Sequence, residues 1–246
     1  MIIITGFGKE NSLGAGIARA LVSSGYKGKI VAVVNKDIPC DLVDDCNHVV
    51  IKANLSLPSN WQYVISEVSK IGEPIDGLIN AAGANHMDWI KNIKYQDYSN
   101  IMRINLDAPI FLTKEIDKIM SNGFVLNVCS MGARKPFRTS MPYNVSKAAL
   151  VMATKQMARE LYPESGNVIF GISPNQIAGS GMTNDNESEI LKVRGWSKEQ
   201  ADSYRMSGML VKEDTTLNQV SDFIAYLLKS RDSYIQFCGM EIQYGD

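Results

Sequence analysis

The stretch TGFGKENSLGAG, residues 5–16, follows the apolar run MIII and precedes a helical pattern, and it holds four glycines in twelve residues. A helix N-terminus presents unpaired backbone N–H groups and a partial positive charge, and glycine lets the backbone approach an anion closely. Between a strand and a helix, such a stretch is typical of a loop that binds nucleotide phosphates. Glycine-rich turns also occur without a ligand, and the spacing here differs from the usual G-x-G-x-x-G. Other features of the sequence are needed to decide whether this stretch is a phosphate-binding loop or a turn without a ligand.

The chain has 246 residues, enough for one large domain spanning residues 1–246. Its formal charge of −1 indicates no broad surface for nucleic acid or for an anionic membrane. It shows no leader-like start and no apolar run long enough to cross a membrane, so we expect a cytoplasmic protein. Cys40, Cys46 and His48 match no common ligand spacing, so we expect free thiols and no metal.

Strand and helix patterns alternate from end to end. Helical patterns cover residues 16–24, 59–71 (with Ser56 or Ser59 as the N-cap), 95–119, 144–162 and 213–228. Seven short apolar runs predict strands at residues 2–5, 29–35, 48–53, 77–80, 123–129, 167–173 and 234–243. Near-continuous apolar strands separated by helices predict an α/β fold with a doubly wound parallel seven-stranded sheet, covered by helices on both faces (a Rossmann fold).

One long polar segment, residues 175–210, interrupts the alternation. Ser197 and Gln200 have the spacing of a capping box, which predicts a short helix over residues 197–204. Segments of this length in a compact domain are usually functional, so we expect a substrate lid.

Tyr143 and Lys147 stand four residues apart at the start of the helical pattern 144–162, on one helix face. An ammonium beside a phenol stabilises the phenolate, which predicts a lowered pKa for Tyr143 and a proton usable near neutral pH. Ser130, thirteen residues before Tyr143, ends a strand where its hydroxyl could hold a substrate oxygen. A Tyr-x-x-x-Lys alone occurs often by chance, but here it follows the glycine loop and the serine in order.

These residues, together with LINAAG at residues 78–83 and Asn105 in RINLDAP, resemble the short-chain dehydrogenase/reductase family over essentially the whole chain. The resemblance implies an NAD(P)-dependent oxidoreductase that moves hydride to or from a ketone or secondary alcohol. It implies that Tyr143 is the general acid/base, that Lys147 lowers its pKa and binds the nicotinamide ribose, and that Ser130 polarises the carbonyl. Asn105 would hold a proton-relay water through its backbone.

The cofactor site that the resemblance implies begins in the glycine loop. Where an acidic residue would read the adenosine ribose of NAD, this chain has Asn35 followed by Lys36, which favours NADP(H), although an asparagine also allows NAD(H). The residues expected to contact the cofactor are Gly6, Ser12, Leu13, Gly16, Asn35, Lys36, Asn54, Leu55, Asn80, Ala81, Gly83, Tyr143, Lys147, Pro174 and Ile177.

Several positions depart from the family pattern. Asn175 stands where a glycine is common, and Gly179 stands where a threonine meets the nicotinamide amide, with Thr183 as a candidate replacement. The glycine loop, T-G-x5-S-x3-G-I-A, is similar to that of enoyl-acyl-carrier-protein reductases, so an enoyl-thioester reductase is an alternative. Those enzymes space the catalytic Tyr and Lys by seven residues, and here the seventh residue after Tyr143 is Leu150.

Two further questions stay open at the level of sequence. The substrate could be a polar or sugar-type ketone or a 3-oxoacyl thioester, and a non-catalytic NAD(P)-binding sensor or scaffold is a second alternative. The helical patterns 95–119 and 144–162 are those through which relatives associate, so we expect a homodimer or homotetramer.

Overall fold

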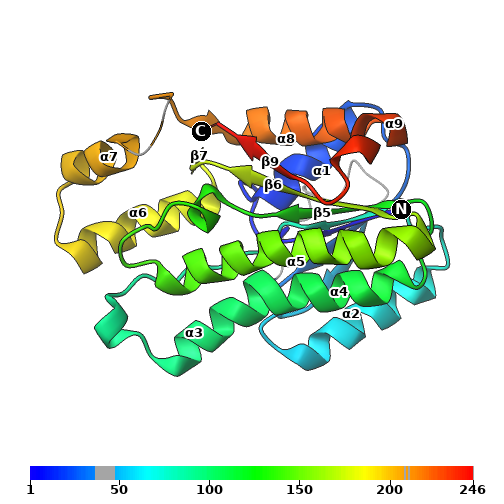
Figure 1. Ribbon diagram of the computed structural model, residues 1–246, viewed down its shortest axis with the longest axis horizontal. Coiled ribbons are helices and arrows are strands. Elements are labelled where there is room, and N and C mark those ends of the chain that lie inside the picture. Colours follow the sequence, from blue (N-terminus) through cyan, green and yellow to red (C-terminus); the bar gives the residue numbers. More distant parts are fainter. Residues whose placement is uncertain (37–47, 208, 210, 246) are drawn as a thin grey trace.

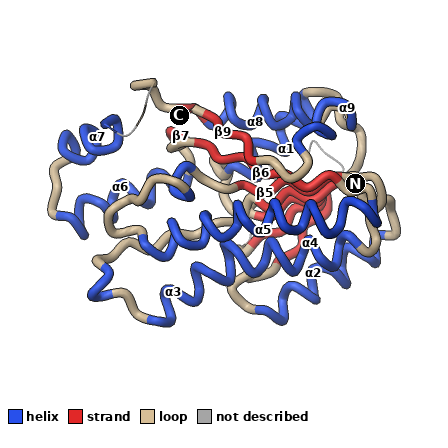
Figure 2. Tube along the Cα trace, in the orientation of Figure 1, coloured by secondary structure: helices blue, strands red, loops and turns tan. Residues whose placement is uncertain are grey.

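A computed structural model of the chain describes residues 1–36, 48–207, 209 and 211–245. Seven parallel strands form one sheet in the order β3-β2-β1-β4-β5-β6-β9, which confirms the doubly wound α/β fold. Figure 2 shows the strands gathered between the helices. The strands are β1 (Ile2–Thr5), β2 (Ile30–Val34), β3 (His48–Lys52), β4 (Gly77–Asn80), β5 (Phe124–Val128), β6 (Val168–Pro174) and β9 (Glu241–Tyr244).

Helices cover both faces of the sheet (Figure 1). On one face lie α1 (Leu13–Ser23), α8 (Leu217–Leu227) and α9 (Arg231–Tyr234). On the other lie α2 (Pro58–Ile71), α3 (Tyr95–Met102), α4 (Ala108–Asp117) and α5 (Met141–Ser165). The connections between these elements include the short helices η2 (Ile90–Asn92), η4 (Met131–Ala133) and η5 (Ile235–Phe237).

Each strand feeds two hydrophobic cores because successive side chains point to opposite faces. Ile2 and Ile4 pack into the core beneath α1 and α8, whereas Ile3 between them packs into the core beneath α2 and α4. All three are at most 2% exposed. The near-continuous apolar runs in the sequence therefore have the burial on both sides that parallel sheets require.

The predicted helix over residues 95–119 is interrupted. A π-helical turn, η3 (Arg103–Asp107), separates α3 from α4, and the helical path ends at Asp117. Such turns insert an extra residue and often occur at functional sites. Hydrophobic periodicity cannot reveal a single extra residue, so the sequence predicted one continuous helix.

The polar segment 175–210 is more regular than predicted. It contains a two-residue strand β7 (Ile177–Ala178), a helix α6 (Gly181–Arg194) that the sequence analysis missed, and α7 (Lys198–Ser207). β7 pairs with β8 (Thr215–Thr216) in a second small sheet. The capping box before α7 is present, with Ser197 N–H donating to Gln200 Oε1 at 2.9 Å and Gln200 N–H donating to Ser197 Oγ at 3.3 Å. α6 was missed because charged and polar side chains surround it and leave no apolar stripe.

Three other boundaries differ from the prediction. Residues 231–237 are helical, so the last strand begins only at Glu241, and α8 begins at Leu217 behind a capping box of Thr216 and Gln219. α2 begins at Pro58 with Leu57 as N-cap, so neither Ser56 nor Ser59 caps it.

The strands all point the same way, from the end where the N-terminus lies in Figure 1 toward α6 and α7. The crossover direction reverses between the adjacent strands β1 and β4. Ligands of doubly wound sheets bind at the carboxyl ends of the strands beside such a reversal, so the candidate site lies there. Among the described helices, none is long and apolar enough to cross a membrane.

Candidate active site

The backbone just after β1 lies very close to the backbone just after β4. Thr5 accepts a hydrogen bond at its hydroxyl from the backbone N–H of Ala82 at 3.0 Å. Gly6 has a φ of 78°, and a Cβ on it would lie 2.6 Å from backbone atoms of Ala81 and Ala82. Only glycine fits both this conformation and this close approach, so Gly6 shapes the loop that follows.

The glycine loop ends at the N-terminus of α1. Ser12 is the N-cap, and its hydroxyl accepts from Ala15 N–H at 3.3 Å, while Leu13 is the first residue of the helix. One orphan N–H of the helix is thereby satisfied by the protein itself. The remaining backbone N–H groups of the first turn stay at the carboxyl edge of the sheet, where a phosphate would meet the positive end of the helix dipole.

The glycines of this loop have different neighbours. A Cβ on Gly14 would lie 2.8 Å from the carbonyl oxygen of Gly6, so these two glycines pack against each other. A Cβ on Gly8 would meet nothing within 4 Å. The loop is therefore packed at its base and open at Gly8, which fits the close approach of a pyrophosphate.

Gly16 faces away from that open side. A Cβ on it would lie 2.5 Å from Ser221 Oγ and 3.2 Å from Leu217, both on α8. In the structure this glycine lets α1 and α8 pack closely. The phosphate contact that the sequence predicted for Gly16 stays a prediction.

The expected adenosine end of the site follows β2 and β3. Asn35 and Lys36 are exposed just beyond Val34, the last residue of β2. Asn54 accepts at Oδ1 from Ser56 N–H at 3.0 Å and from Ser56 Oγ at 2.8 Å, and Leu55 is buried in the core. The side-chain oxygen of Asn54 thus shapes the turn into α2, and its contact with a cofactor stays a prediction.

Asn80 at the end of β4 is 1% exposed and faces the core. Its Nδ2 donates to Asn127 Oδ1 at 2.9 Å and to Thr113 Oγ1 at 3.4 Å, and Asn127 donates to Thr154 Oγ1 at 2.9 Å. This buried network joins β4 and β5 to α4 and α5. It supports the two central strands through Asn80 Nδ2, while Asn80 Oδ1 is buried without a partner among the described residues.

Ser130, Tyr143 and Lys147 come together at the carboxyl edge of β5. Ser130 is the N-cap of η4, where its hydroxyl accepts from Gly132 N–H at 3.0 Å, and the Tyr143 side chain hydrogen-bonds to Ser130. Lys147 is 4% exposed; its Nζ lies 5.9 Å from the centre of the Tyr143 ring and donates to the Val128 carbonyl at 2.7 Å. Two residues one helical turn apart on α5 thus meet the serine that follows the neighbouring strand.

The proton affinities of this trio are set first by burial. Burial raises the pKa of the Tyr143 phenol, and the hydrogen bond to Ser130 opposes that rise. Burial lowers the pKa of Lys147 to about 8. The sequence predicted a lowered pKa for Tyr143; in the structure this pKa is raised, because desolvation disfavours the phenolate and weakens the charge on Lys147 as well.

Asn105 lies in the π-helical turn and is fully buried. Its Oδ1 accepts from Ala84 N–H at 2.8 Å, and its Nδ2 donates to the Ala84 carbonyl at 2.9 Å and to Ser146 Oγ at 3.0 Å. The side chain therefore fixes the loop after β4 against the helix that carries Tyr143 and Lys147.

Gly83 lies where three parts of the site meet. A Cβ on it would lie 3.3 Å from Met182 Cε on α6, 3.7 Å from Asn105 Oδ1 and 3.8 Å from Lys147 Nζ. Gly83 therefore keeps the space beside the Lys147 ammonium free of a side chain.

Pro174 and Ile177 lead from β6 toward α6. Pro174 ends β6 beside Tyr244, and the carbonyl of Ile177 accepts from Thr183 Oγ1 at 2.8 Å. Thr183 Oγ1 also accepts from Ser180 Oγ at 3.0 Å. The hydroxyl of Thr183, considered from the sequence as a contact for the nicotinamide amide, is thus engaged at the start of α6.

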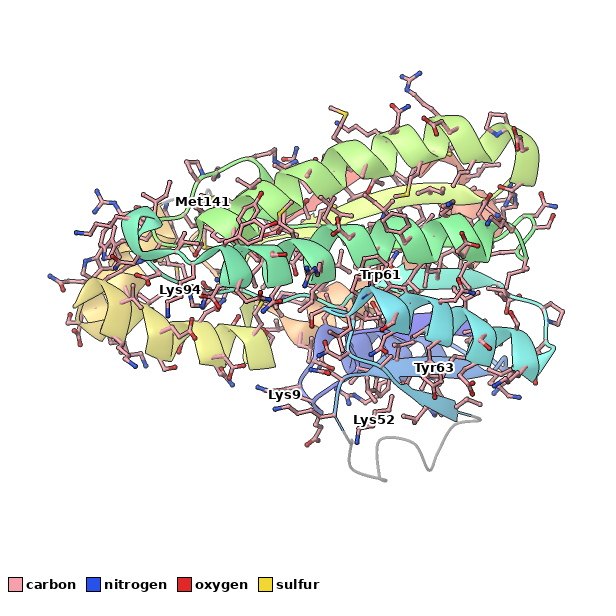
Figure 3. The ribbon with its side chains drawn as sticks, turned by 90° about the horizontal axis from the view of Figure 1, so that it is seen from below. Lys9, Lys52, Trp61, Tyr63, Lys94 and Met141 are labelled. Carbon is pink, nitrogen blue, oxygen red and sulfur yellow. The ribbon has the colours of Figure 1, made fainter. Side chains whose placement is uncertain are left out.

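The glycine loop is attached to α6, which the sequence did not indicate. Asn11 donates from Nδ2 to the Gly179 carbonyl at 2.9 Å and accepts at its own carbonyl from Gly181 N–H at 3.2 Å. Lys9 Nζ lies 2.9 Å from Asp185 Oδ2, and Figure 3 shows Lys9 beside the N-terminal end of this helix. Nothing local in the sequence signals this contact, because its two sides are far apart along the chain.

Sequence reasoning also left out residues that shape the site. No contacts were predicted for Thr5, Asn11 and Gly14, although all three stand in the stretch 5–16. The described residues hold no group of His, Cys, Asp or Glu that could bind a metal. Cys40 and Cys46 lie outside the described residues, while Cys129 and Cys238 are free thiols.

Comparison with known proteins decides the family. The family model of the short chain dehydrogenases matches residues 1–190. The chain belongs to the short-chain dehydrogenase family. This short-chain dehydrogenase is therefore an oxidoreductase that transfers hydride between a nicotinamide cofactor and its substrate.

A relative and two solved structures are similar over nearly the full length. Asnovolin H dehydrogenase of Aspergillus novofumigatus is 26% identical, over 96% of this chain and 92% of its own. The structure of 4-hydroxyisoleucine dehydrogenase with NADH has a TM-score of 0.82 and 20% identity, covering 99% of this short-chain dehydrogenase and 96% of that chain. A single-residue variant of actinorhodin polyketide ketoreductase with NADPH has a TM-score of 0.84 and 17% identity, covering 99% and 95%. Both structures share its fold.

Proposed function

We propose that the protein interconverts a ketone and a secondary alcohol, with Tyr143 as the general acid/base. The observation that carries this proposal is the meeting of Ser130, Tyr143 and Lys147 at the carboxyl edge of β5, with the Tyr143–Ser130 hydrogen bond and Lys147 Nζ 5.9 Å from the Tyr143 ring. A phenol, a hydroxyl and an ammonium in this order suit proton transfer to an alkoxide.

In the reduction, the protein supplies the proton and holds the carbonyl. Ser130 Oγ–H and Tyr143 Oη–H donate to the carbonyl oxygen, and Tyr143 gives up its proton as negative charge develops there. The Lys147 ammonium stabilises the resulting phenolate. The hydrogen bond to Ser130 opposes the effect of burial on the Tyr143 pKa. A bound nicotinamide supplies or accepts the hydride.

The loop around Gly6, Gly8 and Ser12 would hold the pyrophosphate, since it is open at Gly8 and leads into the N-terminus of α1. Lys147 and the space beside Gly83 would hold the nicotinamide ribose. For the adenosine ribose we propose NADP(H) over NAD(H), supported by the exposed Asn35 and Lys36 after β2. Titration of both cofactors, followed by tryptophan quenching, tests this preference. Equal affinity for NAD(H) and NADP(H) would contradict it. Lys36→Gln should lower the affinity for NADP(H) and leave that for NAD(H) unchanged.

The test of the reaction is Tyr143→Phe. We expect kcat to fall by about 10²–10⁴-fold, with cofactor affinity unchanged, because only the acidic proton is removed. Tyr63→Phe on the exposed surface of α2 is the matched control and should keep full activity. Wild-type activity in Tyr143→Phe would contradict the proposal.

A panel of carbonyl compounds with NADPH and NADH separates the alternatives. Reduction of an acetoacetyl thioester or a polar ketone supports the proposal, whereas reduction of a crotonyl thioester alone would favour an enoyl-thioester reductase. Normal cofactor binding without turnover of any carbonyl or alcohol would favour a sensor or scaffold.

We propose a homodimer or homotetramer formed through α4 and α5. Phe111 on α4 and Val145 and Met152 on α5 are exposed, Met152 by 64%. Sedimentation equilibrium of Met152→Glu should show a smaller species than the wild type, while Tyr226→Glu on the exposed side of α8 should not. We also propose a cytoplasmic location, which the free thiols Cys129 and Cys238 support.

A further inference from the structure

The loop after β4 and the helix α6 contact each other at two places. Gly83 lies against Met182, whose Cε would be 3.3 Å from a Cβ on the glycine. Two residues on, Asn85 Nδ2 donates to Asn186 Oδ1 across a long 3.4 Å. Met182 and Asn186 are four residues apart and therefore share one face of α6. This face of α6 forms a wall that starts beside Lys147 and reaches Asn85.

Asn85 carries an acceptor that the protein does not use. Its Oδ1 is buried and has no hydrogen-bond partner among the described residues. A buried amide oxygen without a donor is unfavourable, and most such groups in proteins are paired. Asn85 stands two residues after Gly83, and it is Gly83 that lies next to the Lys147 ammonium.

The backbone on which Asn85 stands is held rigidly. The side chain of Asn105 binds both the N–H and the carbonyl of Ala84, the residue between Gly83 and Asn85. The backbone next to Asn85 is thereby held by the same side chain that connects this loop to α5 through Ser146. A rigidly placed acceptor discriminates between ligands better than a mobile one.

We propose that Asn85, together with Asn186, determines specificity by binding a hydroxyl group of the substrate. Asn85 Oδ1 accepts the hydrogen bond of that hydroxyl, and the long contact to Asn186 leaves room for the amide pair to adjust around it. The inference rests on the proposed ketone/alcohol chemistry and narrows its substrates to hydroxylated ketones and polyols. A simple alkyl ketone or a 3-oxoacyl thioester brings no donor beside its ketone and would leave the acceptor unpaired.

The experiment compares 1-hydroxy-2-butanone and 4-hydroxy-2-butanone with 2-butanone, in the wild type, Asn85→Leu and Asn85→Asp. We expect the wild type to prefer at least one hydroxyketone by about tenfold or more in kcat/KM, since a site built for a hydroxyl rejects the analogue that lacks it. Asn85→Leu should lose that preference while keeping its activity on 2-butanone. Asn85→Asp keeps an acceptor oxygen and should retain the preference.

Asn184→Ala, on the exposed side of α6, is the matched control and should behave as the wild type. Equal kcat/KM for all three ketones in an active wild type would overturn this inference and leave the proposed function standing. The inference would also be overturned if Asn85→Leu lost the same factor of kcat/KM on all three ketones and Asn85→Asp showed no preference for a hydroxyketone. Turnover of no ketone by protein that binds NADPH or NADH would overturn the proposed function and this inference together.

Should Asn85→Leu fail to fold, the side-chain amide signals in a ¹H–¹⁵N spectrum give a second readout on the wild type with cofactor. One asparagine side-chain pair absent from Asn85→Asp should shift with a hydroxyketone and stay unchanged with 2-butanone. A shift of equal size with both ketones would overturn the inference.

Discussion

The side chain of Asn105 hydrogen-bonds both the backbone N–H and the backbone carbonyl of Ala84, at 2.8 and 2.9 Å. Removing it leaves two backbone groups unpaired, each at about 1–3 kcal/mol. We therefore expect Asn105→Ala to lower the free energy of unfolding by about 2–6 kcal/mol in urea titrations. Gln96→Ala on the exposed surface of α3 should change it by less than about 0.5 kcal/mol. An Asn105→Ala protein as stable as the wild type would show that the loop after β4 is held by other contacts.

The close approach of α1 and α8 at Gly16 makes a second prediction. A Cβ there would lie 2.5 Å from Ser221 Oγ, so Gly16→Ala should destabilise the protein by about 1–3 kcal/mol. Ser221 Oγ is buried without a partner among the described residues, so Ser221→Ala alone should be tolerated. In the double variant, removal of Oγ should restore much of the loss, which a double-mutant cycle measures.

Gly8→Ala is the control for this cycle, because its Cβ would meet nothing within 4 Å. Its stability should stay within about 0.5 kcal/mol of the wild type. We expect its cofactor affinity to fall, since the added methyl group occupies the open side of the loop. Additive effects of Gly16→Ala and Ser221→Ala would rule out a direct contact.

The lowered pKa of Lys147 gives stability a specific dependence on pH. Between about 8 and its ordinary value of 10.5, the unfolded chain binds the Lys147 proton and the folded chain does not. Stability therefore rises with pH across this window, by up to about 3 kcal/mol from this residue. The raised pKa values of Cys129 and Tyr143 act in the opposite direction above their ordinary values, since the folded chain then binds more protons.

The Lys147 contribution is isolated by subtraction. The difference in unfolding free energy between the wild type and Lys147→Met should grow in favour of the wild type from pH 8 to pH 10.5, because the cost of a buried charge disappears. Urea titrations at half-unit intervals measure it. A difference that stays flat over this range would contradict the burial of a charged Lys147.

Arg194 attaches α6 and α7 to the loop before α5. Its guanidinium lies 4.8 Å from the Trp196 ring and 5.2 Å from the Tyr204 ring, and Nε donates to Thr139 Oγ1 at 3.0 Å. Losing these contacts should lower the opening free energy of α7 by about 1–2 kcal/mol. In Arg194→Met, amide hydrogen exchange in α7 should then be about 5–30-fold faster.

Lys192→Met, two residues earlier and exposed, controls for the loss of a positive charge and should leave exchange unchanged. If α7 exchanges at the same rate in Arg194→Met, the aromatic rings and not the arginine hold this helix in place.

Much of the fold could be predicted from the sequence because its signals are local. Apolar runs such as residues 2–4 fix the strands, and a spacing of four brings Tyr143 and Lys147 together on a helix. The packing of Gly16 against α8 could not be predicted, because its neighbour Ser221 is distant in sequence. The pKa of Tyr143 was predicted in the wrong direction, because it depends on burial that only the folded chain creates. α6 was missed because it has no apolar stripe; contacts between residues far apart in sequence hold it, such as that of Gly181 with Asn11 and that of Met182 with Gly83.

The π-helical turn Arg103–Asp107 amounts to one residue more than a regular helix would need. Deleting one residue from RINLD would restore an unbroken α-helical register from α3 into α4. The same deletion would rotate Asn105 by about 100° about the helix axis and release Ala84. The irregular turn between α3 and α4 thus keeps the side-chain amide of Asn105 directed at the loop after β4. A shorter, smoother helix would gain order at the expense of activity, a trade-off that natural enzymes often retain.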